Sequence, residues 1–600
     1  MRVIAVPQLV FLTVFFAALL ALGGCSSEPE PGPEPQKTYR HSMDGTPTGL
    51  DPAHASNVYA GFLVVNLFDT LYRYRYLARP YEITENLAAG PPVVSADGLT
   101  YTITLKQGVR FQHDPAFDQG VGREVSAEDL VYSLKRHFDP EVRSRGSWLW
   151  RDRIQGMAEW QAQGSDYDQP VTGLRALDRY TVEVRLTRPF PQFVYTLTTA
   201  HSALVPREVV EARGREFGTA PVGSGPFRLI SMDTTRAELE RNPEYRREKI
   251  DLAAEGFDPL RHAGLGLESV DGREMPLVDR AVVDFVVDGA SGWVSFTAGN
   301  EIQYVRLPPD LFDQALASRS PPRLKPDLEQ QYHLHVTPEF GVTQIVFNLD
   351  DPGIGYQPDP EANLRNRDLR CALRKAFDWD QRNQVFYGGI AQIYPGVIPP
   401  AVPEFDPDAD RSSVTHDPEG ARQILQRLGS AENLPVLEYT YNSGVAQQRG
   451  FEQFRGQMSA VGYPDDKITR RVFATFPDVS RAASNRELQI WVYGWTMDYP
   501  DAENVLALFY GPNRAPGNNV TNYANPEYDR LFEQAAAMQP SPERTAIYRQ
   551  LNQMLIDDCV SIAGVTRVRA YLTHRDVIGV PDRELVGGYF LRFVDVVETP

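Results

Sequence analysis

The sequence is poor in cysteine and in positive charge. Only three of its 600 residues are cysteines, too few for a disulfide-built scaffold or a zinc site held by cysteines. Asp and Glu total 79 against 60 Lys and Arg, which gives a net charge of −19. Because a surface this acidic repels phosphate backbones, the charge argues against general nucleic-acid binding.

Motifs of common enzymes are also missing. The sequence contains no GxxxxGK[ST] phosphate loop, no GxSxG nucleophile elbow and no HExxH zinc motif. The glycine-rich stretch Gly223–Phe227 lacks the lysine of a phosphate loop, and we interpret it as a tight turn before a strand. His333 and His335 would share one face of a strand, but no third metal ligand is nearby. We therefore favour structural roles for both histidines and expect no metal and no cofactor.

The overall composition is that of a large globular protein. Hydrophobic residues make up 42% and charged residues 23%, which excludes wholesale disorder. At roughly 150 residues per domain, the length predicts about four domain-equivalents. Neither an internal repeat nor a clean linker is visible after residue 40.

A long apolar run occurs only near the N-terminus. It extends from Leu9 to Leu22, interrupted by Thr13, and Arg2 is the only charge before it. The run is too short to span a bilayer comfortably and has the layout of a secretory signal. It ends in Leu22-Gly23-Gly24-Cys25, which resembles a bacterial lipobox. We expect residues 1–24 to be a signal peptide and Cys25 to be lipidated; an anchor helix ending in Gly-Gly is the alternative.

The segment that follows alternates proline and glutamate and cannot build a core. We expect residues 25–37 to be the lipidated cysteine and an extended tether that holds the body off a membrane. Loss of residues 1–24 removes Arg2, so the mature charge becomes −20. Cys371 and Cys559 then remain in an oxidising compartment. They form a disulfide or stay as two buried thiols, and the sequence leaves both open.

Strand-like and helix-like patterns alternate along the body. Leu99–Leu105 and Tyr180–Leu186 alternate polar and apolar residues as half-buried strands do. Ser126 and Asp129 resemble a capping box that opens a helix through His137. Further helices are expected at Asn366–Phe377, from Pro526 onward, and at Pro542–Ile556. The pattern predicts a mixed α/β fold with α+β elements.

The stretch from Ile490 to Pro500 has an unusual composition. It is an apolar, aromatic strand that leads into a single aspartate, Asp498, which we expect to be at least partly buried. A buried carboxylate is costly unless a cation or strong donors meet it. If no internal arginine does so, a ligand ammonium is suited to the task, with aromatic walls around it: Trp491, Tyr493, Trp495 and Tyr499. The alternative is that Asp498 caps the next turn and the aromatic residues belong to the core.

Asp498, Asp501 and Glu503 also form the best acidic cluster for hydrolysis. A secreted hydrolase that uses Asp498 and Glu503 as an acid/base pair is therefore a second hypothesis. For Asp501 and Glu503, a solvated acidic loop is the simpler interpretation.

A family resemblance becomes specific at this point. The chain resembles the extracytoplasmic solute-binding proteins of ABC importers, in the oligopeptide- and dipeptide-binding class known as family 5. The matches run in order along nearly the whole mature chain: Leu50–Pro52, Leu67–Tyr72, Asp97–Leu105, Gly108–Phe111, Ser126–Ser133, Val222–Leu229, Asn242–Tyr245, Val346–Asn348, Leu369–Asp378, Gly494–Pro500 and Asn525–Leu531.

The resemblance implies a two-lobed, periplasmic-binding-protein-like fold of class II with a hinge and a ligand cleft between the lobes. Residues 38–85, 200–336 and 561–600 would form domain I of the first lobe, and residues 86–199 an inserted domain II. Residues 337–560 would form domain III, the second lobe. Discontinuous domains explain why no linker is visible.

The resemblance also implies a site. In peptide-binding members, the Asp of a Gly-Trp-x-x-Asp-Tyr motif pairs with the ligand's α-ammonium, and the matching residue is Asp498. By position, the backbone of Gly494, Trp495 and Thr496 would pair with the peptide as an added strand, with Tyr493 and Tyr499 beside it. A loop of the opposite lobe, Asn57 to Tyr59, would contribute.

The resemblance implies a binding protein without chemistry of its own. We expect a monomer, anchored at Cys25, that delivers a peptide to a permease and its ATPase. Relatives of this fold also carry nickel chelates, haem, sugars and antibiotics, so a non-peptide solute is an alternative, as is an envelope sensor or chaperone. The segments 148–168 and 251–273 have no clear family equivalent, and no carboxylate-binding arginine is identifiable.

Overall fold

The structure is a computed structural model of the chain, and it describes residues 36–299, 302–580 and 588–597. The expected signal peptide, the lipidation site Cys25 and the tether up to residue 35 therefore lie outside the described residues. The following description concerns the body of the protein, from Thr38 onward.

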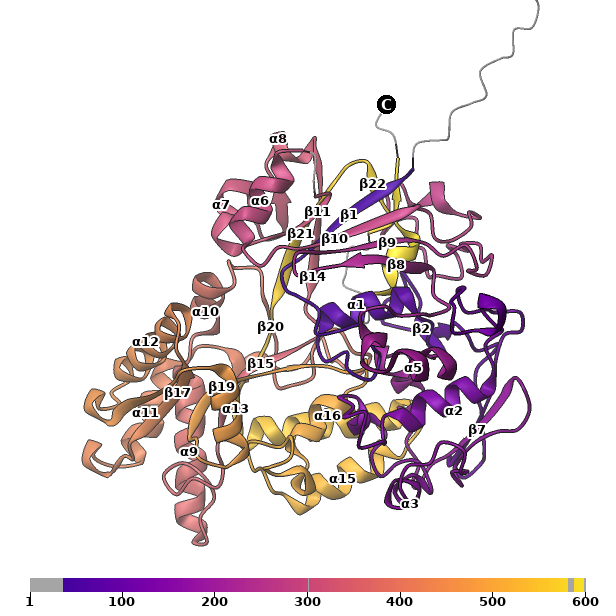
Figure 1. Ribbon diagram of the computed structural model, residues 1–600. Coiled ribbons are helices and arrows are strands. Elements are labelled where there is room, and N and C mark those ends of the chain that lie inside the picture. The colour runs from indigo at the N-terminus through magenta and orange to yellow at the C-terminus, as the bar shows by residue number, and fades with distance from the viewer. Residues whose placement is uncertain (1–35, 300–301, 581–587, 598–600) are drawn as a thin grey trace, which may run out of the picture. The chain divides into compact units, whose positions relative to one another are not determined.

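Strands from the beginning, middle and end of the body meet in one seven-stranded sheet (Figure 1). In sheet order the strands are β14 (Tyr332–Pro338), β21 (Val568–His574), β11 (Tyr304–Leu307), β1 (Thr38–Met43), β10 (Arg280–Phe285), β9 (Arg236–Arg241) and β8 (Phe227–Met232). β1 runs parallel to both of its neighbours, while the other pairs are antiparallel. The turn predicted at Gly223–Phe227 leads into β8, as expected.

A smaller, four-stranded sheet is formed by residues that lie in the sequence between β1 and the other strands of the seven-stranded sheet. Its order is β4 (Val93–Val94), β5 (Thr100–Thr104), β7 (Thr181–Arg185) and β6 (Leu174–Ala176). Helix α2 (Ala127–Arg136) packs on it and begins at the predicted capping box, where the Ser126 N–H donates to Asp129 Oδ2 at 2.8 Å. The buried side chains of this sheet are continuous with those of the seven-stranded sheet, so both rest on one hydrophobic core.

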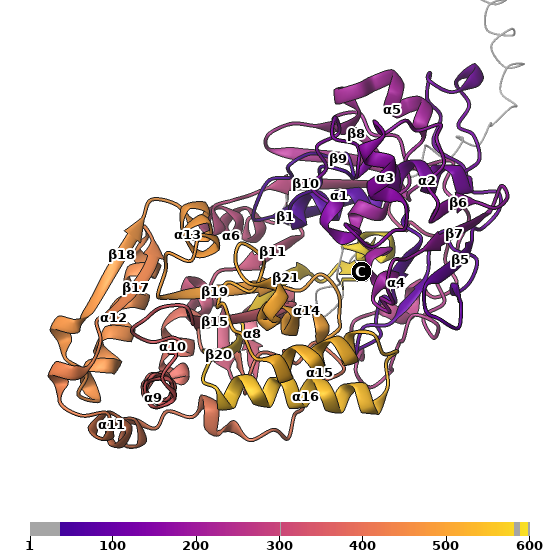
Figure 2. The ribbon, with the colours of Figure 1, turned by 90° about the horizontal axis from the view of Figure 1, so that it is seen from below.

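The second large sheet has six strands and its own core. In order they are β16 (Gln392–Ile393), β20 (Ser561–Thr566), β15 (Gly341–Phe347), β19 (Ile490–Thr496), β17 (Leu437–Asn442) and β18 (Ile468–Phe473). The helices of this part of the chain are α9 (Pro360–Ala376), α10 (Trp379–Phe386), α11 (Pro418–Arg427), α12 (Val445–Ala460), α13 (Phe476–Ser484), α14 (Glu503–Leu506), α15 (Pro526–Ala536) and α16 (Pro542–Asp557). Figure 2 shows α15 and α16 side by side, in agreement with their contacts.

The chain crosses between the two large sheets twice. The first crossing joins β14 to β15 through Glu339, and the second joins β20 to β21 through Arg567. The two crossings are bonded to each other, because the Glu339 N–H donates to the Arg567 carbonyl at 2.8 Å and Arg567 Nε donates to the Glu339 carboxylate at 2.6 Å. The expected return to the first lobe at residue 561 falls too early, since β20 still pairs with β15.

The predicted secondary structure is largely confirmed. The strands expected at Leu99–Leu105 and Tyr180–Leu186 are β5 and β7, and the helix expected at Pro542–Ile556 is α16. The helix expected from Asn366 begins earlier, at Pro360. The sequence pattern did not indicate this start, because the first turns of the helix are polar and carry no apolar stripe. Its start is fixed instead by Asp359, whose side chain accepts from the Ala362 N–H at 2.8 Å.

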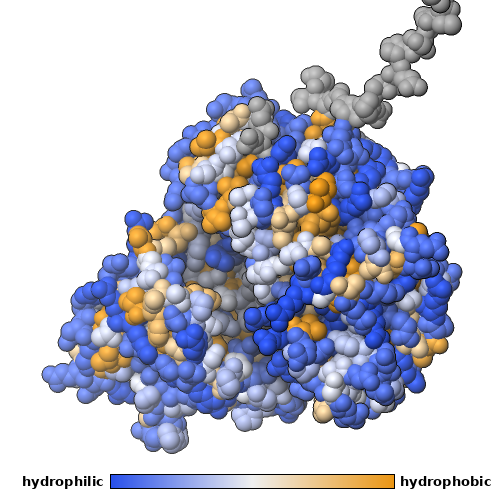
Figure 3. Space-filling view, in the orientation of Figure 1, coloured by the Kyte–Doolittle hydropathy of each residue, from blue (hydrophilic) through white to orange (hydrophobic). Residues whose placement is uncertain are grey.

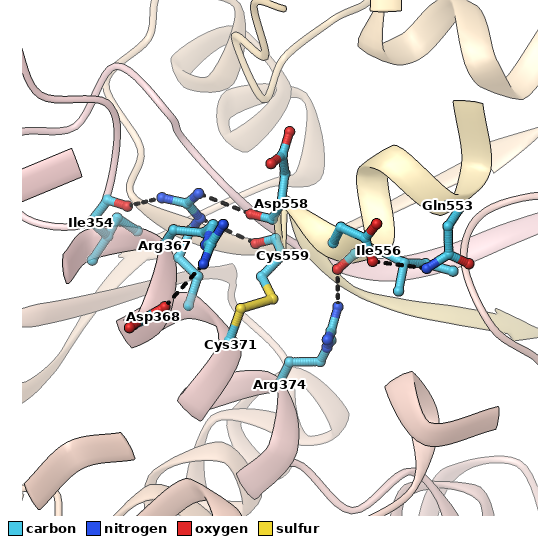
Figure 4. The surroundings of a disulfide bond; sticks show 11 residues. Ile354, Arg367, Asp368, Cys371, Arg374, Gln553, Ile556, Asp558 and Cys559 are labelled. Carbon is cyan, nitrogen blue, oxygen red and sulfur yellow. Dashed lines mark hydrogen bonds and ion pairs between the residues drawn. A yellow bond between two sulfur atoms is a disulfide. The ribbon is translucent and has the colours of Figure 1, made fainter. Parts of the chain in front are cut away.

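Cys371 and Cys559 form a disulfide in the structure (Figure 4). The bond joins α9 to the residue that follows the C-terminal turn of α16, across 188 residues of sequence. Arg370 reinforces the same junction, since its guanidinium donates to the carbonyl oxygens of Ile354, Asp558 and Cys559. Among the residues from 36 onward that the structure describes, none belongs to a helix long and apolar enough to cross a membrane.

Candidate functional site

A large cavity is lined by both large sheets. Its volume is about 1450 Å³, above the roughly 300–1,000 Å³ that is usual for small-molecule sites. One wall comes from β1, β11 and β21, and the other from β15, β17, β19 and α10. Figure 3 shows the surface hollowed between these two parts of the molecule. A cavity of this size accommodates a ligand of several residues or a bulky cofactor-sized molecule.

In the second lobe, which is built on the six-stranded sheet, the cavity extends into a gap between β17 and β19, called the fork below. β17 and β19 pair in parallel only at Tyr439–Ile490 and Thr440–Trp491. Beyond these pairs the strands diverge, and residues of both of them line the cavity. β15 continues to pair with β19 as far as Thr496 on the other side. One edge of β19 is therefore left without a strand partner where it faces the cavity.

Asp498 lies just beyond the end of β19, at the wall of the cavity. It is half-buried, as the sequence predicted, and burial raises the pKa of its carboxyl to about 6. Its hydrogen-bond partner is neutral: Asn504 Nδ2 donates to Asp498 Oδ2 at 3.0 Å. No described residue forms an ion pair with it. Asp498 is thus a desolvated carboxylate, open to a cation from the cavity.

The side chain of Asn504 fixes the positions of Asp498 and Trp495. Its Oδ1 accepts from the Asp498 N–H at 3.1 Å and from Trp495 Nε1 at 2.9 Å. One amide therefore fixes both the aspartate and the indole that precedes it by three residues. The side chain of Asn504 is itself buried, so the arrangement is shielded from water.

A buried ion cluster fixes the segment that carries these residues. Arg544 Nη2 lies 2.8 Å from Glu404 Oε1 and 2.7 Å from Asp501 Oδ2, and all three side chains are almost fully buried. Asp501 Oδ1 also accepts from the Glu503 N–H at 3.0 Å. The cluster ties α16 to the turn after Asp498. Asp501 and Glu503 are therefore not a solvated acidic loop, because the turn that carries them is packed into the core.

The structure brings six of the eight expected ligand-binding residues to the cavity. Four of these come from the second lobe (Gly494, Trp495, Thr496, Asp498) and two from the first (Asn57, Tyr59). The polar groups of the two first-lobe residues are already engaged. Asn57 Oδ1 caps α1 (Val58–Leu67) by accepting from the Ala60 N–H, and the Tyr59 hydroxyl donates to Asp44 Oδ1 at 3.0 Å.

Tyr493 and Tyr499 do not line the cavity. Tyr493 packs among the side chains that join β19 to α13. Tyr499 is buried, stacks on Tyr195 at 5.8 Å between ring centroids, and donates its hydroxyl to Glu503. It therefore links the second lobe to helix α4 (Phe193–Thr196) of the first lobe.

The acid/base pair of the hydrolase hypothesis is not assembled at the cavity. Asp498 lines it, but Glu503 does not. Glu503 points into the protein, where burial raises its pKa and the Tyr499 hydroxyl binds it. His335 lines the cavity but donates or accepts at Thr573 Oγ1, 2.9 Å away, and no cluster suited to a metal occurs among the described residues.

The opposite wall is aromatic, which no pattern in the sequence indicated. Its rings stack in a continuous chain, with 4.3 Å between the centroids of His41 and Tyr304, 5.0 Å between His41 and Phe62, and 5.2 Å between Tyr304 and Tyr571. Burial lowers the pKa of His41 to about 3, so this imidazole is uncharged at neutral pH. Distant segments supply the rings, and only the fold brings them together.

Comparison with known proteins agrees with this architecture. Residues 82–517, more than half of the chain, match the family described as bacterial extracellular solute-binding proteins, family 5. The peptide transport periplasmic protein SapA of Salmonella typhimurium is 25% identical over 558 residues, covering 89% of this chain and 88% of that protein. Heme-binding protein A of Haemophilus influenzae is 22% identical and covers 76% of this chain and 74% of that protein.

A solved structure shows the same fold. The periplasmic binding protein DppA of Helicobacter pylori, in complex with the peptide STSA, superposes with a TM-score of 0.68 at 18% identity, over 94% of this chain and 99% of that one. Two lobes joined by two crossings, with a cavity between them, define the class of two-lobed extracytoplasmic binding proteins. Within that class, the chain belongs to the bacterial extracellular solute-binding proteins of family 5.

Proposed function

We propose that this protein captures peptides and hands them to an ABC importer. Relatives whose names include peptide transport and dipeptide binding support a peptide ligand. The observation that carries the proposal is Asp498, a desolvated carboxylate at the cavity wall with no cationic partner among the described residues. The α-ammonium of a peptide would supply the missing charge.

The open edge of β19 supports the same ligand class. A peptide that extends along Gly494, Trp495 and Thr496 would add a strand in the fork between β17 and β19. Such pairing uses backbone groups that every peptide carries. It therefore fits a ligand defined by its backbone and its amino terminus more than by its side chains.

The proposal is tested by native mass spectrometry of the protein with a pool of short synthetic peptides, followed by calorimetry on a binder. Asp498→Asn should make the binding free energy of that peptide less favourable by about 2–5 kcal/mol, the usual cost of truncating a buried charge pair. Asp408→Asn is the matched control, because Asp408 is an exposed carboxylate outside the cavity. Unchanged affinity in Asp498→Asn would refute the ammonium role.

We expect the protein to release its ligand chemically unchanged. Glu503 lies away from the cavity, so Asp498 has no acid/base partner beside it. Peptides recovered after prolonged incubation should therefore have their original masses. Cleavage products would favour the hydrolase, and a non-peptide molecule that co-purifies from the native cells would favour another solute.

We further propose an anchored, extracytoplasmic protein with three domains. The lipobox-like sequence before Cys25 and the disulfide between Cys371 and Cys559, which suits an oxidising compartment, support the location. Lipid labelling in native cells should disappear in Cys25→Ser. The domains would be built on the seven-, four- and six-stranded sheets, and a decrease in the radius of gyration on peptide binding would report closure of the lobes.

A further inference from the structure

Glu503 differs from every other buried carboxylate in the part of the chain that the structure describes. Ten carboxylate side chains are buried there, and nine of them form an ion pair with an arginine: Asp51, Asp69, Asp114, Asp129, Glu255, Asp284, Glu404, Asp501 and Asp595. Glu503 is the tenth, and among the described residues only the Tyr499 hydroxyl donates to its side chain. A buried carboxylate is costly unless a cation compensates it or it binds a proton.

The cation that acts on Glu503 belongs to the first lobe. Burial raises the pKa of Glu503, and the charge of Arg153 opposes that shift. Burial likewise lowers the pKa of Arg153, and there Tyr499 and Glu503 oppose the shift. The two charges are therefore close to each other, although no direct ion pair joins them in the described chain.

The guanidinium of Arg153 is itself without a polar partner. Among the described residues it makes neither a hydrogen bond nor an ion pair, and it lies over the Phe190 ring at 3.5 Å from the centroid. Its backbone is fixed next to the end of β7, where the Thr187 N–H donates to the Arg153 carbonyl at 2.8 Å. Five N–H donors are thus held at one place beside an aromatic face.

An aromatic stack joins the two lobes at the same place. Tyr195 of α4 lies nearly parallel to Tyr499, with 5.8 Å between the ring centroids and 12° between the planes. Tyr499 directly follows Asp498 in the sequence, and its partner Glu503 directly precedes Asn504. A shift of Tyr499 and Glu503 would therefore move both residues that form the expected ammonium site.

We infer that Arg153 is the countercharge of Glu503 and a positioning residue for the ligand site. Through this charge, the first lobe holds the turn between Asp498 and Asn504 in the geometry that receives a peptide's amino group. The expected effect on peptide binding rests on the proposed function, whereas the charge pairing does not depend on it. Residues 148–168, which have no clear family equivalent in the sequence, thereby gain a role in binding.

A double-mutant cycle on the ligand-free protein tests the pairing. Arg153→Gln should lower the melting temperature, because Glu503 loses its countercharge. The same substitution should have almost no effect in Glu503→Gln, which can still accept from Tyr499 but carries no charge. Arg153→Lys, which keeps the charge, should melt close to the wild type. Equal losses in both backgrounds would overturn the inference, since Glu503 would then be protonated or Arg153 would act only through its packing on Phe190.

Peptide titration of the same variants tests the positioning role. Arg153→Gln should weaken the binding of an amine-bearing peptide about 2- to 30-fold, the range for residues that act on a site through others. Arg153→Lys should restore most of the affinity. In Asp498→Asn, the substitution Arg153→Gln should have little further effect, because the group that Arg153 positions is gone.

Arg151→Gln is the matched control, because Arg151 lies on the same segment, is exposed and does not line the cavity. It should change neither the melting temperature nor the affinity. Wild-type affinity in Arg153→Gln, or an equal loss in Asp498→Asn, would overturn the positioning role. A wild type that binds no peptide would refute the proposed function instead, and the melting temperatures of the cycle would still decide the pairing.

Discussion

Asn504 donates one hydrogen bond to the side chain of Asp498 and accepts another from its backbone, so a single neutral amide orients the charged residue of the cavity wall. The donated bond also lowers the pKa of Asp498, against the larger effect of burial. Asn504 thus favours the ionised form of Asp498.

Asn504→Ala should weaken the binding of amine-bearing peptides, because Asp498 loses both its orientation and the one side-chain donor it has among the described residues. We expect an effect of about 1–2 kcal/mol, typical of one hydrogen bond to a charged group and smaller than that of Asp498→Asn. Titration calorimetry at pH 7.5, above the pKa of about 6, measures this loss with Asp498 largely ionised and the peptide amine still mostly protonated. Affinity equal to that of the wild type at this pH would contradict the positioning role.

Peptide binding should depend on pH through Asp498. Its pKa in the free protein is about 6, and an ammonium bound beside it would lower that value. Binding should therefore be strongest near pH 7. It should weaken as the pH falls below 6, since a proton must leave Asp498 before the pair forms, and also above about pH 8, where the α-ammonium of the free peptide loses its own proton. Calorimetry in buffers of different ionisation enthalpy should show a proton released near pH 6. Asp498→Asn should eliminate this release, and its persistence in that variant would point to another group.

Gly494 offers a steric test of strand addition. It is exposed at the cavity, and a Cβ at this position would find its nearest atom, Thr343 Oγ1, at 3.7 Å. The fold should therefore tolerate Gly494→Ala and Gly494→Val with little change in melting temperature. Peptide affinity should fall stepwise from Gly to Ala to Val, because the added methyl groups occupy the space of the ligand backbone. Equal affinities in all three proteins would show that the peptide lies elsewhere.

The cluster of Arg544, Glu404 and Asp501 should be essential for stability. Arg544→Met would leave two buried carboxylates without a cation and should cost about 3–5 kcal/mol in urea unfolding at pH 7. Burial and Asp501 already raise the pKa of Glu404, so the loss should shrink as the pH falls and Glu404 gains a proton. Glu404→Gln, which leaves one arginine with one aspartate, should cost much less. A loss of equal size in both variants would contradict the charge argument.

The disulfide should contribute measurably to the stability of the second lobe. The double variant Cys371→Ser, Cys559→Ser should unfold with a free energy about 2–5 kcal/mol lower than the wild type, since the crosslink restricts the unfolded chain over 188 residues. Wild-type protein treated with a reductant under unfolding conditions should behave in the same way. An unfolding midpoint that responds to neither change would show that the bond does not restrict the unfolded state.

The sequence was informative where the pattern is local. The alternation in Leu99–Leu105, the capping box at Ser126 and the aromatic approach to Asp498 each predicted what the structure shows, because neighbouring residues determine them. The start of α9 at Pro360 was missed, since its polar first turn carries a cap but no apolar stripe.

Features assembled from distant segments were beyond the sequence. The aromatic wall joins His41 to Tyr304 and Tyr571, and no spacing rule links these positions. Arg382 lies in a short, mostly polar helix, and only the fold reveals that its charge is buried without a carboxylate partner among the described residues. Tyr499 was expected beside the ligand, but the turn after Met497 directs it toward Tyr195.

The divergence of β17 from β19 affects how the ligand selectivity of such a protein can evolve. A strand edge offers the same donors and acceptors whatever side chains surround it. Substitutions at Tyr439 or Tyr441 would alter which residues of a cargo fit, without removing the backbone contacts that hold it. Ligand selectivity can therefore change by single substitutions, each of which still permits uptake of the ligand.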